Sequence, residues 1–175
     1  FIFFLPIGNN NLPNFYNTLK LWFSNLEFNG SLYYIIRYLG YKIMGYNIIK
    51  SVGLVTPLIT SITILYLTLY KKRKETKTTL EDMFLILSFF YLISMVVHPW
   101  YIITILYLGL FTKYNFQIIW SALIFLTYSA YQNSKVEENF YLIGLEYIIV
   151  VGFFIYEFLG QEKIKTFLKK KFLFL

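Results

Sequence analysis

A run of 19 residues without a charged side chain, Val52 to Tyr70, is the feature that most constrains how this chain folds. As a helix these residues would extend about 28 Å, which is close to the hydrocarbon thickness of a bilayer. The basic cluster Lys71-Lys72-Arg73-Lys74 follows at once. An apolar segment of this length that ends in cations is typical of a membrane-spanning helix.

The composition of the whole chain agrees with a membrane protein. It is 58% hydrophobic and only 14% charged, whereas soluble domains carry roughly a quarter charged residues. The net charge is +7, but the cations stand between and after apolar runs, which is how membrane topology is encoded. No nucleic-acid partner is therefore expected. The chain has no cysteine, which excludes disulfides, thiolate metal sites and cysteine nucleophiles.

Four more apolar segments follow the first one. They predict helices over Leu80–Val97, Pro99–Phe111, Gln117–Tyr131 and Tyr141–Leu159. Pro99 disfavours helical geometry at His98 and suits the first turn of the next helix, so we expect a break there. The third and fourth helices are short for a complete span. The predicted fold is an all-α membrane protein with about five transmembrane helices in residues 51–175.

Residues 1–50 differ from the rest of the chain. The opening FIFFLPI is interpreted as the end of a preceding apolar segment, and the chain as the C-terminal part of a longer membrane protein. Asn9-Asn10-Asn11 and Pro13 predict a loop. Helical spacing of apolar residues then predicts two short amphipathic helices at the membrane surface, over residues 14–24 and 31–43.

The basic residues indicate an orientation. If Lys71 to Lys77 are cytoplasmic, 11 basic residues fall inside and 5 outside, as the positive-inside rule requires. We therefore expect a multi-pass protein of the bacterial inner membrane with a cytoplasmic C-terminus. His98 and the 8–50 segment then lie on the outer face.

On the outer side of the membrane, four ionisable residues are candidates for a site: Glu27, Arg37, His98 and Glu146. The guanidinium of Arg37 suits a phosphate or carboxylate. An ionisable side chain such as Glu146, about a third of the way into a span, should face protein or water. Several polar groups on one face of an apolar bundle favour a site.

Structural roles account for the same residues when each is taken singly. Glu146 would be protonated or hydrogen-bonded to a neighbouring helix, which makes it a structural polar residue. Arg37 would pair with Glu27 or with anionic lipid headgroups. Trp100 and Tyr101 would belong to the interfacial aromatic belt.

The chain contains none of the common sequence motifs for metal binding, nucleotide binding or hydrolysis. One histidine and scattered carboxylates provide no metal-ligand spacing, and there is no phosphate loop, dinucleotide fingerprint or serine-hydrolase elbow. No metal or cofactor is expected.

Three segments resemble the C-terminal half of bacterial membrane mannosyltransferases. They are LEFNGSLYYIIRYLGY (Leu26–Tyr41), VVHPWYIITILYLGLFTKYNF (Val96–Phe116) and LEYIIVVGFFIYE (Leu145–Glu157). The resemblance covers nearly the whole chain and is to a Bacteroidetes-type group within the glycosyltransferase C superfamily.

This resemblance implies transfer of a sugar, expected to be mannose, from a polyprenyl-phosphate donor to a glycan or lipid acceptor on the non-cytoplasmic face. The catalytic aspartate or glutamate of such enzymes, which acts as the general base, lies in an earlier outer loop that is expected to be absent from this chain. Glu27 is a weaker candidate for this base. Together with the predicted topology, the resemblance points to Arg37 and His98 as phosphate-binding residues. Trp100, Tyr101, Tyr33 and Tyr34 would border the sugar or the prenyl chain.

Two other functions remain open at this point. A transporter or flippase segment would need an internal repeat and paired broken helices near the midplane, and no convincing repeat occurs. A non-catalytic membrane subunit would need no site at all.

Overall fold

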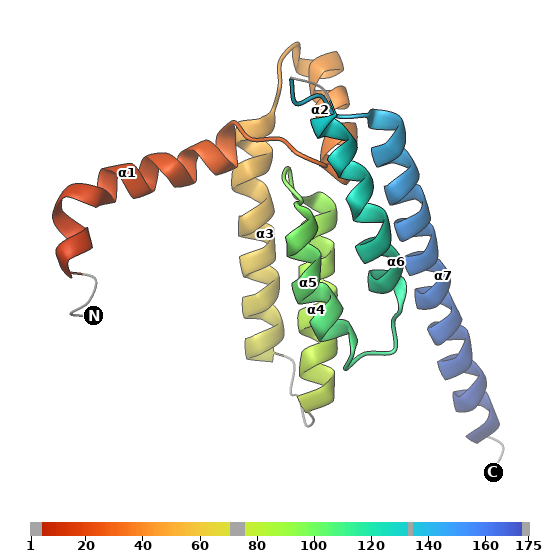
Figure 1. The fold of residues 1–175 in the computed structure, drawn as a ribbon. Helices are drawn as coiled ribbons and strands as arrows, with labels where there is room; N and C mark the ends of the chain where they lie inside the picture. The colour runs from red at the N-terminus through yellow and green to blue at the C-terminus, as the bar shows by residue number, and fades with distance from the viewer. Residues whose placement is uncertain (1–4, 71–75, 133–134, 173–175) are drawn as a thin grey trace. The chain divides into compact units, whose positions relative to one another are not determined.

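The computed structural model describes residues 5–70, 76–132 and 135–172, with side chains at 12–21, 25–70, 76, 78–132 and 135–160. All elements in these ranges are helices, apart from a single isolated β-bridge (Figure 1). The all-α prediction is therefore confirmed for the described part of the chain.

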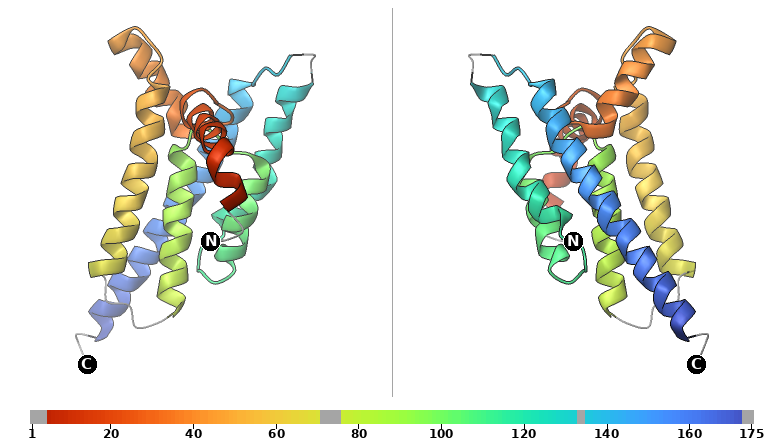
Figure 2. Two further views of the ribbon diagram at one scale, coloured as in Figure 1. Left: turned by 90° about the vertical axis from the view of Figure 1, so that its left-hand side faces the viewer. Right: turned by 90° about the vertical axis from the view of Figure 1, so that its right-hand side faces the viewer.

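The helices follow in this order: α1 (Leu5–Ser24), α2 (Ser31–Met44), α3 (Ile49–Tyr70), α4 (Thr76–Ile93), the 3₁₀ helix η2 (Pro99–Tyr101), α5 (Ile102–Gly109), α6 (Phe116–Leu123), the 3₁₀ helix η3 (Ile124–Tyr131) and α7 (Phe140–Phe172). The two views of Figure 2 show α3 and the longer α7 as straight rods.

The chain divides into two compact units. Residues 1–71 and 89–97 form the first unit, and residues 72–88 and 98–175 form the second. Helix α4 contributes residues to both units. The division predicted at residue 50, between an outer segment and a transmembrane region, stays a prediction.

In the first unit, a short parallel bridge ties the segment after α1 to the segment after α4. The backbone N–H of Phe28 donates to the carbonyl of Met95 at 3.0 Å, and the N–H of Val97 donates to the carbonyl of Phe28 at 2.8 Å. Phe28, Val96 and Val97 are all buried. The pairing places Glu27, which precedes Phe28, on a fixed piece of backbone.

The N-terminal segment corrects one prediction. The loop expected at Asn9-Asn10-Asn11 and Pro13 is instead part of α1, which begins at Leu5 and contains Pro13. Helix α1 contacts α3, but the side chains of residues 12–21 are all exposed, so packing does not account for the helix at Pro13. A proline inside a helix interrupts its hydrogen bonds and bends it, and Figure 1 shows α1 as a bent helix. The second predicted surface helix, over 31–43, corresponds to α2.

The second unit is held together by α6, which packs against α5, η3 and α7. Its core contains large side chains with almost no exposed surface, among them Trp120, Phe84 and Phe116. The ring of Phe116 lies 5.2 Å from that of Phe84 and 5.0 Å from that of Phe154, measured between centroids. Aromatic pairs at such separations stabilise a core beyond their buried area.

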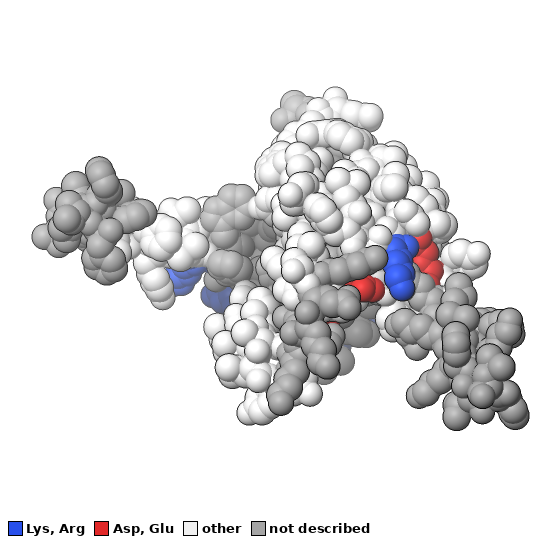
Figure 3. Space-filling view, turned by 90° about the horizontal axis from the view of Figure 1, so that it is seen from below, with Lys and Arg blue, Asp and Glu red and all other residues white. Residues whose placement is uncertain are grey.

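Among the described residues, two helical segments are long and apolar enough to cross a membrane: Ile49–Tyr70 and Phe140–Gly160 of α7. Pro99–Gly109 and Phe116–Tyr131 are apolar but shorter. Helix α4 has three charged residues, Lys77, Glu81 and Asp82, within its 18 residues. The described surface in Figure 3 is mostly uncharged, with charged side chains in small groups.

The predicted second helix ends earlier than expected. The apolar run predicts a helix that continues to Val97, but α4 ends at Ile93. The hydroxyl of Ser94 donates to the carbonyl of Val96 at 3.0 Å and accepts from its N–H at 3.4 Å. Local side-chain bonds of this kind compete with the helix, and the Phe28–Val96 bridge holds the extended segment that follows.

Candidate functional site

Glu27 is the centre of a polar network in the first unit. Its carboxylate forms an ion pair with the guanidinium of Arg37 and accepts a hydrogen bond from the hydroxyl of Tyr33. The amide Nδ2 of Asn47 donates to the same carboxylate at 2.6 Å. The hydroxyl of Tyr33 also lies 3.1 Å from Oδ1 of Asn47. Three donors from two segments of the chain therefore converge on one carboxylate.

The sequence around the network explains this convergence. Tyr33 and Arg37 are four residues apart in α2, so they lie on one side of the helix. Asn47 is in the short connection to α3, where its Oδ1 accepts the backbone N–H of Ile49 at 3.1 Å. Asn29 has a positive φ of 52°, a conformation in which Asn is favoured among non-glycine residues. It turns the chain from Glu27 into α2.

The ionisation of Tyr33 is strongly affected by its position. The side chain has no exposed surface, and burial raises the pKa of its hydroxyl well above the usual value. The hydrogen bond to Glu27 raises the pKa further. Tyr33 is thus a neutral donor to Glu27 and not a nucleophile.

Tyr34 contacts Arg37 from another direction. The guanidinium carbon of Arg37 lies 4.6 Å from the centroid of the Tyr34 ring, which is within the range of a cation–π interaction. Arg37 is partly buried, with a quarter of its side chain exposed. The four residues Glu27, Tyr33, Tyr34 and Arg37, all predicted from the sequence, therefore lie together.

His98 has the extended backbone expected before a proline. Its φ and ψ are −85° and 152°, and Pro99 begins η2. The imidazole stacks on the ring of Trp100, with centroids 4.3 Å apart, and meets the edge of Tyr101 at 5.5 Å. Burial lowers the pKa of His98 from its usual value, so the imidazole is neutral at pH 7.

The predicted binding residues belong to different units. Glu27, Tyr33, Tyr34 and Arg37 are in the first unit, and His98, Trp100 and Tyr101 are in the second. The expectation that both groups lie on the outer face and form one site stays a prediction. Within each group the side chains contact one another.

Glu146 lies in the interior of the second unit. Its carboxyl Oε1 accepts a hydrogen bond of 3.0 Å from the indole Nε1–H of Trp120, and both side chains have no exposed surface. The two residues are in α7 and α6. A carboxyl group buried between helices and hydrogen-bonded there joins the helices.

Sequence reasoning missed two polar residues. Asn47 is not among the residues that the sequence singles out, yet it contacts both Glu27 and Tyr33. Glu157 of α7 accepts from the backbone N–H groups of Asn115 and Phe116 at 2.9 to 3.1 Å, and from the side chain of Asn115 at 3.1 Å. It therefore caps the N-terminus of α6.

The N-cap residue Asn115 makes no side-chain capping hydrogen bond, so the first N–H groups of α6 take their acceptor from Glu157. No local sequence pattern indicates this cap, because Asn115 and Glu157 are 42 positions apart.

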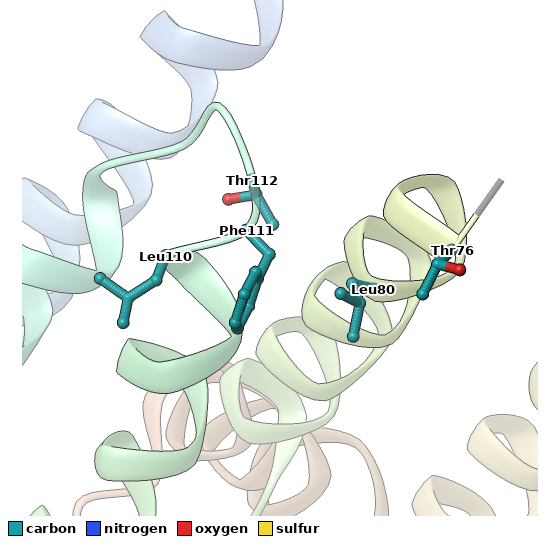
Figure 4. A pocket seen from close by; sticks show the side chains of 5 residues that line it. All are labelled: Thr76, Leu80, Leu110, Phe111 and Thr112. Carbon is teal, nitrogen blue, oxygen red and sulfur yellow. The ribbon is translucent and has the colours of Figure 1, made fainter.

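The second unit also has an open hollow near the beginning of α4. It has a volume of about 360 Å³ and is lined by Thr76, Leu80, Leu110, Phe111 and Thr112 (Figure 4). The hydroxyl of Thr112 donates to the carbonyl of Gly109 at 3.0 Å and accepts from the N–H of Tyr114 at 3.2 Å. The lining thus has no charged side chain, and its Thr112 hydroxyl is used in a turn.

A metal centre is not formed by the described side chains, because no three His, Asp or Glu residues among them come together. Comparison of the chain with protein-family models, curated proteins and solved structures finds no match.

Proposed function

We propose that this chain is part of an integral membrane glycosyltransferase of the glycosyltransferase C type. The enzyme moves a sugar, expected to be mannose, from a polyprenyl-phosphate donor to a glycan or lipid acceptor on the non-cytoplasmic face. The observation that carries the proposal is the partly buried pairing of Arg37 with Glu27 in the segment before α3.

The chemistry of the donor fits this segment. A polyprenyl-phosphate sugar has an anionic phosphate beside a long apolar chain. Arg37 supplies a guanidinium, which binds phosphate through several N–H donors. Exposed apolar side chains of the same helix, among them Ile36 and Leu32, provide a surface for the prenyl chain. Tyr33 and Tyr34 contact Glu27 and Arg37 and hold the cation in place.

In the reaction, a hydroxyl oxygen of the acceptor forms a bond to the anomeric carbon, and the bond from that carbon to the phosphate oxygen breaks. Polyprenyl phosphate leaves with the electron pair, and a base takes the proton of the acceptor. Both oxygens of Glu27 already accept from donors of this chain. We therefore assign Glu27 to holding Arg37 and place the base in an earlier outer loop, as the resemblance implies.

His98 is proposed to contribute a hydrogen bond to the donor. A neutral imidazole both donates and accepts. The stacked ring of Trp100 fixes its orientation. In membranes that contain the full-length enzyme, His98→Ala is expected to reduce transfer without affecting insertion.

The proposal is tested by cross-linking. The chain is reconstituted in phosphatidylcholine vesicles with a photoreactive polyprenyl-phosphate mannose, and the labelled fraction is measured. Loss of a hydrogen bond to a charged group predicts a fall of about ten-fold in labelling for Arg37→Gln. Unchanged labelling would remove Arg37 from the binding site.

Two matched variants control this result. Lys135→Gln removes an exposed cation outside α2, and it is expected to leave labelling unchanged. Glu27→Gln combined with Arg37→Gln removes both charges of the pair at once. If this double variant is weakly labelled but keeps its normal helicity, the loss of labelling is due to lost binding and not to lost folding.

A non-catalytic membrane subunit is the second candidate function. It is favoured by the polar side chains that the chain satisfies by itself, because Glu27 is engaged by three donors and Glu146 by Trp120. This candidate predicts no labelling by the photoreactive donor in any variant.

A further inference from the structure

Helix α2 has an exposed face whose composition is unusual for a protein surface. The side chains of Ile35, Leu39 and Ile43 are four residues apart and therefore form one row along the helix. They are 59%, 48% and 78% exposed. Tyr38 and Tyr41 are exposed in a second row, and Lys42 lies between the two rows. These six residues are called the α2 face.

The opposite side of α2 packs tightly within the first unit. Tyr33 and Gly40 are buried, and a Cβ at Gly40 would lie 2.8 Å from a side-chain carbon of Ile48. The helix therefore has a fixed orientation, in which the α2 face points away from the unit. Its exposure follows from how the helix packs.

Charge indicates what kind of partner fits this face. The ammonium group of Lys42 lies 4.9 Å from the ring centroid of Tyr38, at the edge of the aliphatic row. Among the described residues, neither Lys42 nor the nearby Lys50 has a carboxylate partner. The face is thus cationic at one edge and aliphatic along its length.

We propose that the α2 face docks on anionic phospholipid, with Lys42 at the headgroup phosphates and Ile35, Leu39 and Ile43 among the acyl chains. Tyrosine and lysine are the residues preferred at the interface of a bilayer, where one end of the side chain is apolar and the other is wet. A soluble acidic partner would leave the aliphatic row in water.

The position of α2 along the chain supports this choice. Helix α3, which is long and apolar enough to cross a membrane, begins at Ile49, and only residues 45–48 separate it from Met44. Four residues extend about 14 Å at most. When α3 crosses a bilayer, α2 therefore stays close to the bilayer surface. The inference rests on the membrane insertion in the proposed function, but not on sugar transfer.

The experiment uses the absence of cysteine in the chain. A single Ile43→Cys substitution is labelled with an environment-sensitive fluorophore, and the chain is reconstituted in mixed phosphatidylcholine and phosphatidylglycerol vesicles. Quenching is compared between spin-labelled phosphatidylglycerol and spin-labelled phosphatidylcholine. One cation at an anionic surface predicts a preference for phosphatidylglycerol of about two- to five-fold.

Two variants test the origin of this preference. Lys42→Gln is expected to bring the quenching ratio to one, whereas Lys135→Gln, which removes an exposed cation elsewhere in the chain, should leave it unchanged. A ratio of one before any lysine is replaced overturns the inference. So does equal loss of the preference in both variants.

A label at Leu58→Cys, on an exposed position of α3, separates this inference from the proposed function. No lipid quenching at Leu58 would overturn membrane insertion itself. Lipid quenching at Leu58 with access of aqueous iodide at Ile43 would overturn the α2 inference alone. Self-quenching at Ile43 that disappears on dilution with unlabelled chain would assign the face to a second copy and also overturn it.

Discussion

The carboxyl group of Glu146 in α7 accepts a hydrogen bond of 3.0 Å from the indole nitrogen of Trp120 in α6, and neither side chain has exposed surface. The ring of Tyr147 lies 5.9 Å from that of Trp120 and covers it edge-on. A polar contact between α6 and α7 thus lies inside the apolar part of both helices.

Replacing the donor tests this contact. Trp120→Phe leaves the carboxyl group of Glu146 without the indole and creates a small cavity, so we expect it to lower the free energy of unfolding by about 1–3 kcal/mol. Thermal unfolding in detergent micelles, followed by circular dichroism, measures the change. Glu146→Gln keeps an acceptor oxygen and is the milder control. Equal stability of Trp120→Phe and the parent would show that the hydrogen bond contributes nothing.

The cap provided by Glu157 leads to a second prediction. Glu157→Ala removes the acceptor for the N–H groups of Asn115 and Phe116, and we expect a loss of about 1–2 kcal/mol, as for other helix caps. Hydrogen exchange at Asn115 and Phe116 should become faster. Glu157→Gln retains one acceptor oxygen and should show a smaller effect on both measurements. Unaltered exchange at these amides in Glu157→Ala would contradict the capping role.

Gly109 and Gly144 form a matched pair for a third prediction. A Cβ at Gly109 would lie 2.6 Å from the amide carbon of the buried Gln117, whereas a Cβ at Gly144 would meet nothing within 4 Å. Gly109→Ala should therefore destabilise the chain by about 1–3 kcal/mol through overpacking. Gly144→Ala, near the beginning of α7, should stabilise the chain by up to about 1 kcal/mol.

The same thermal unfolding assay compares these two variants. Adding Gln117→Ala to Gly109→Ala should recover part of the loss, because the clash is with that side chain. Similar effects of both alanine substitutions would mean that helix propensity alone determines the change in stability.

His98 gives a prediction about pH. Burial lowers its pKa in the folded chain below the usual value of about 6.5, so the folded state favours the neutral imidazole. Its contribution to stability is complete above about pH 6.5 and is lost as the pH falls through the folded pKa. His98 is the only histidine, and its imidazole resonance can be followed through a pH titration without assignment.

A matched variant controls the titration. Trp100→Ala uncovers the imidazole and should bring the midpoint back toward 6.5. A midpoint at or above 6.5 in the parent would contradict the desolvation of His98.

The local sequence around His98 and α2 was sufficient to predict their structure. Pro99 restricts the residue before it through steric contacts within the chain, and His98 has the expected extended backbone. Helix α2 was predicted from the spacing of its apolar residues, and its observed bounds differ by one residue at one end. Both features depend on neighbours only a few positions away.

The end of α4 and the beginning of α1 could not be predicted from neighbouring residues in the sequence. An apolar run that continues to Val97 predicts helix, but the backbone of Phe28 takes the hydrogen bonds of Met95 and Val97. Pro13 and the three asparagines before it predict a loop, but α1 begins at Leu5 and continues through them; the side chains of residues 12–21 are exposed, and no packing contact explains this difference. At the end of α4 a distant partner decides, and propensity is too weak to oppose it.

By itself, the sequence determined that the chain is helical, apolar and basic, because the periods of its hydrophobic residues and the grouping of its lysines are local properties. It also placed Glu27 and Arg37 among the residues of interest. Only the tertiary structure decided that Glu27 is engaged by Arg37, Tyr33 and Asn47 and that Glu157 caps α6. These contacts join residues up to 42 positions apart, and a buried or capping polar group takes whichever donors the fold brings to it.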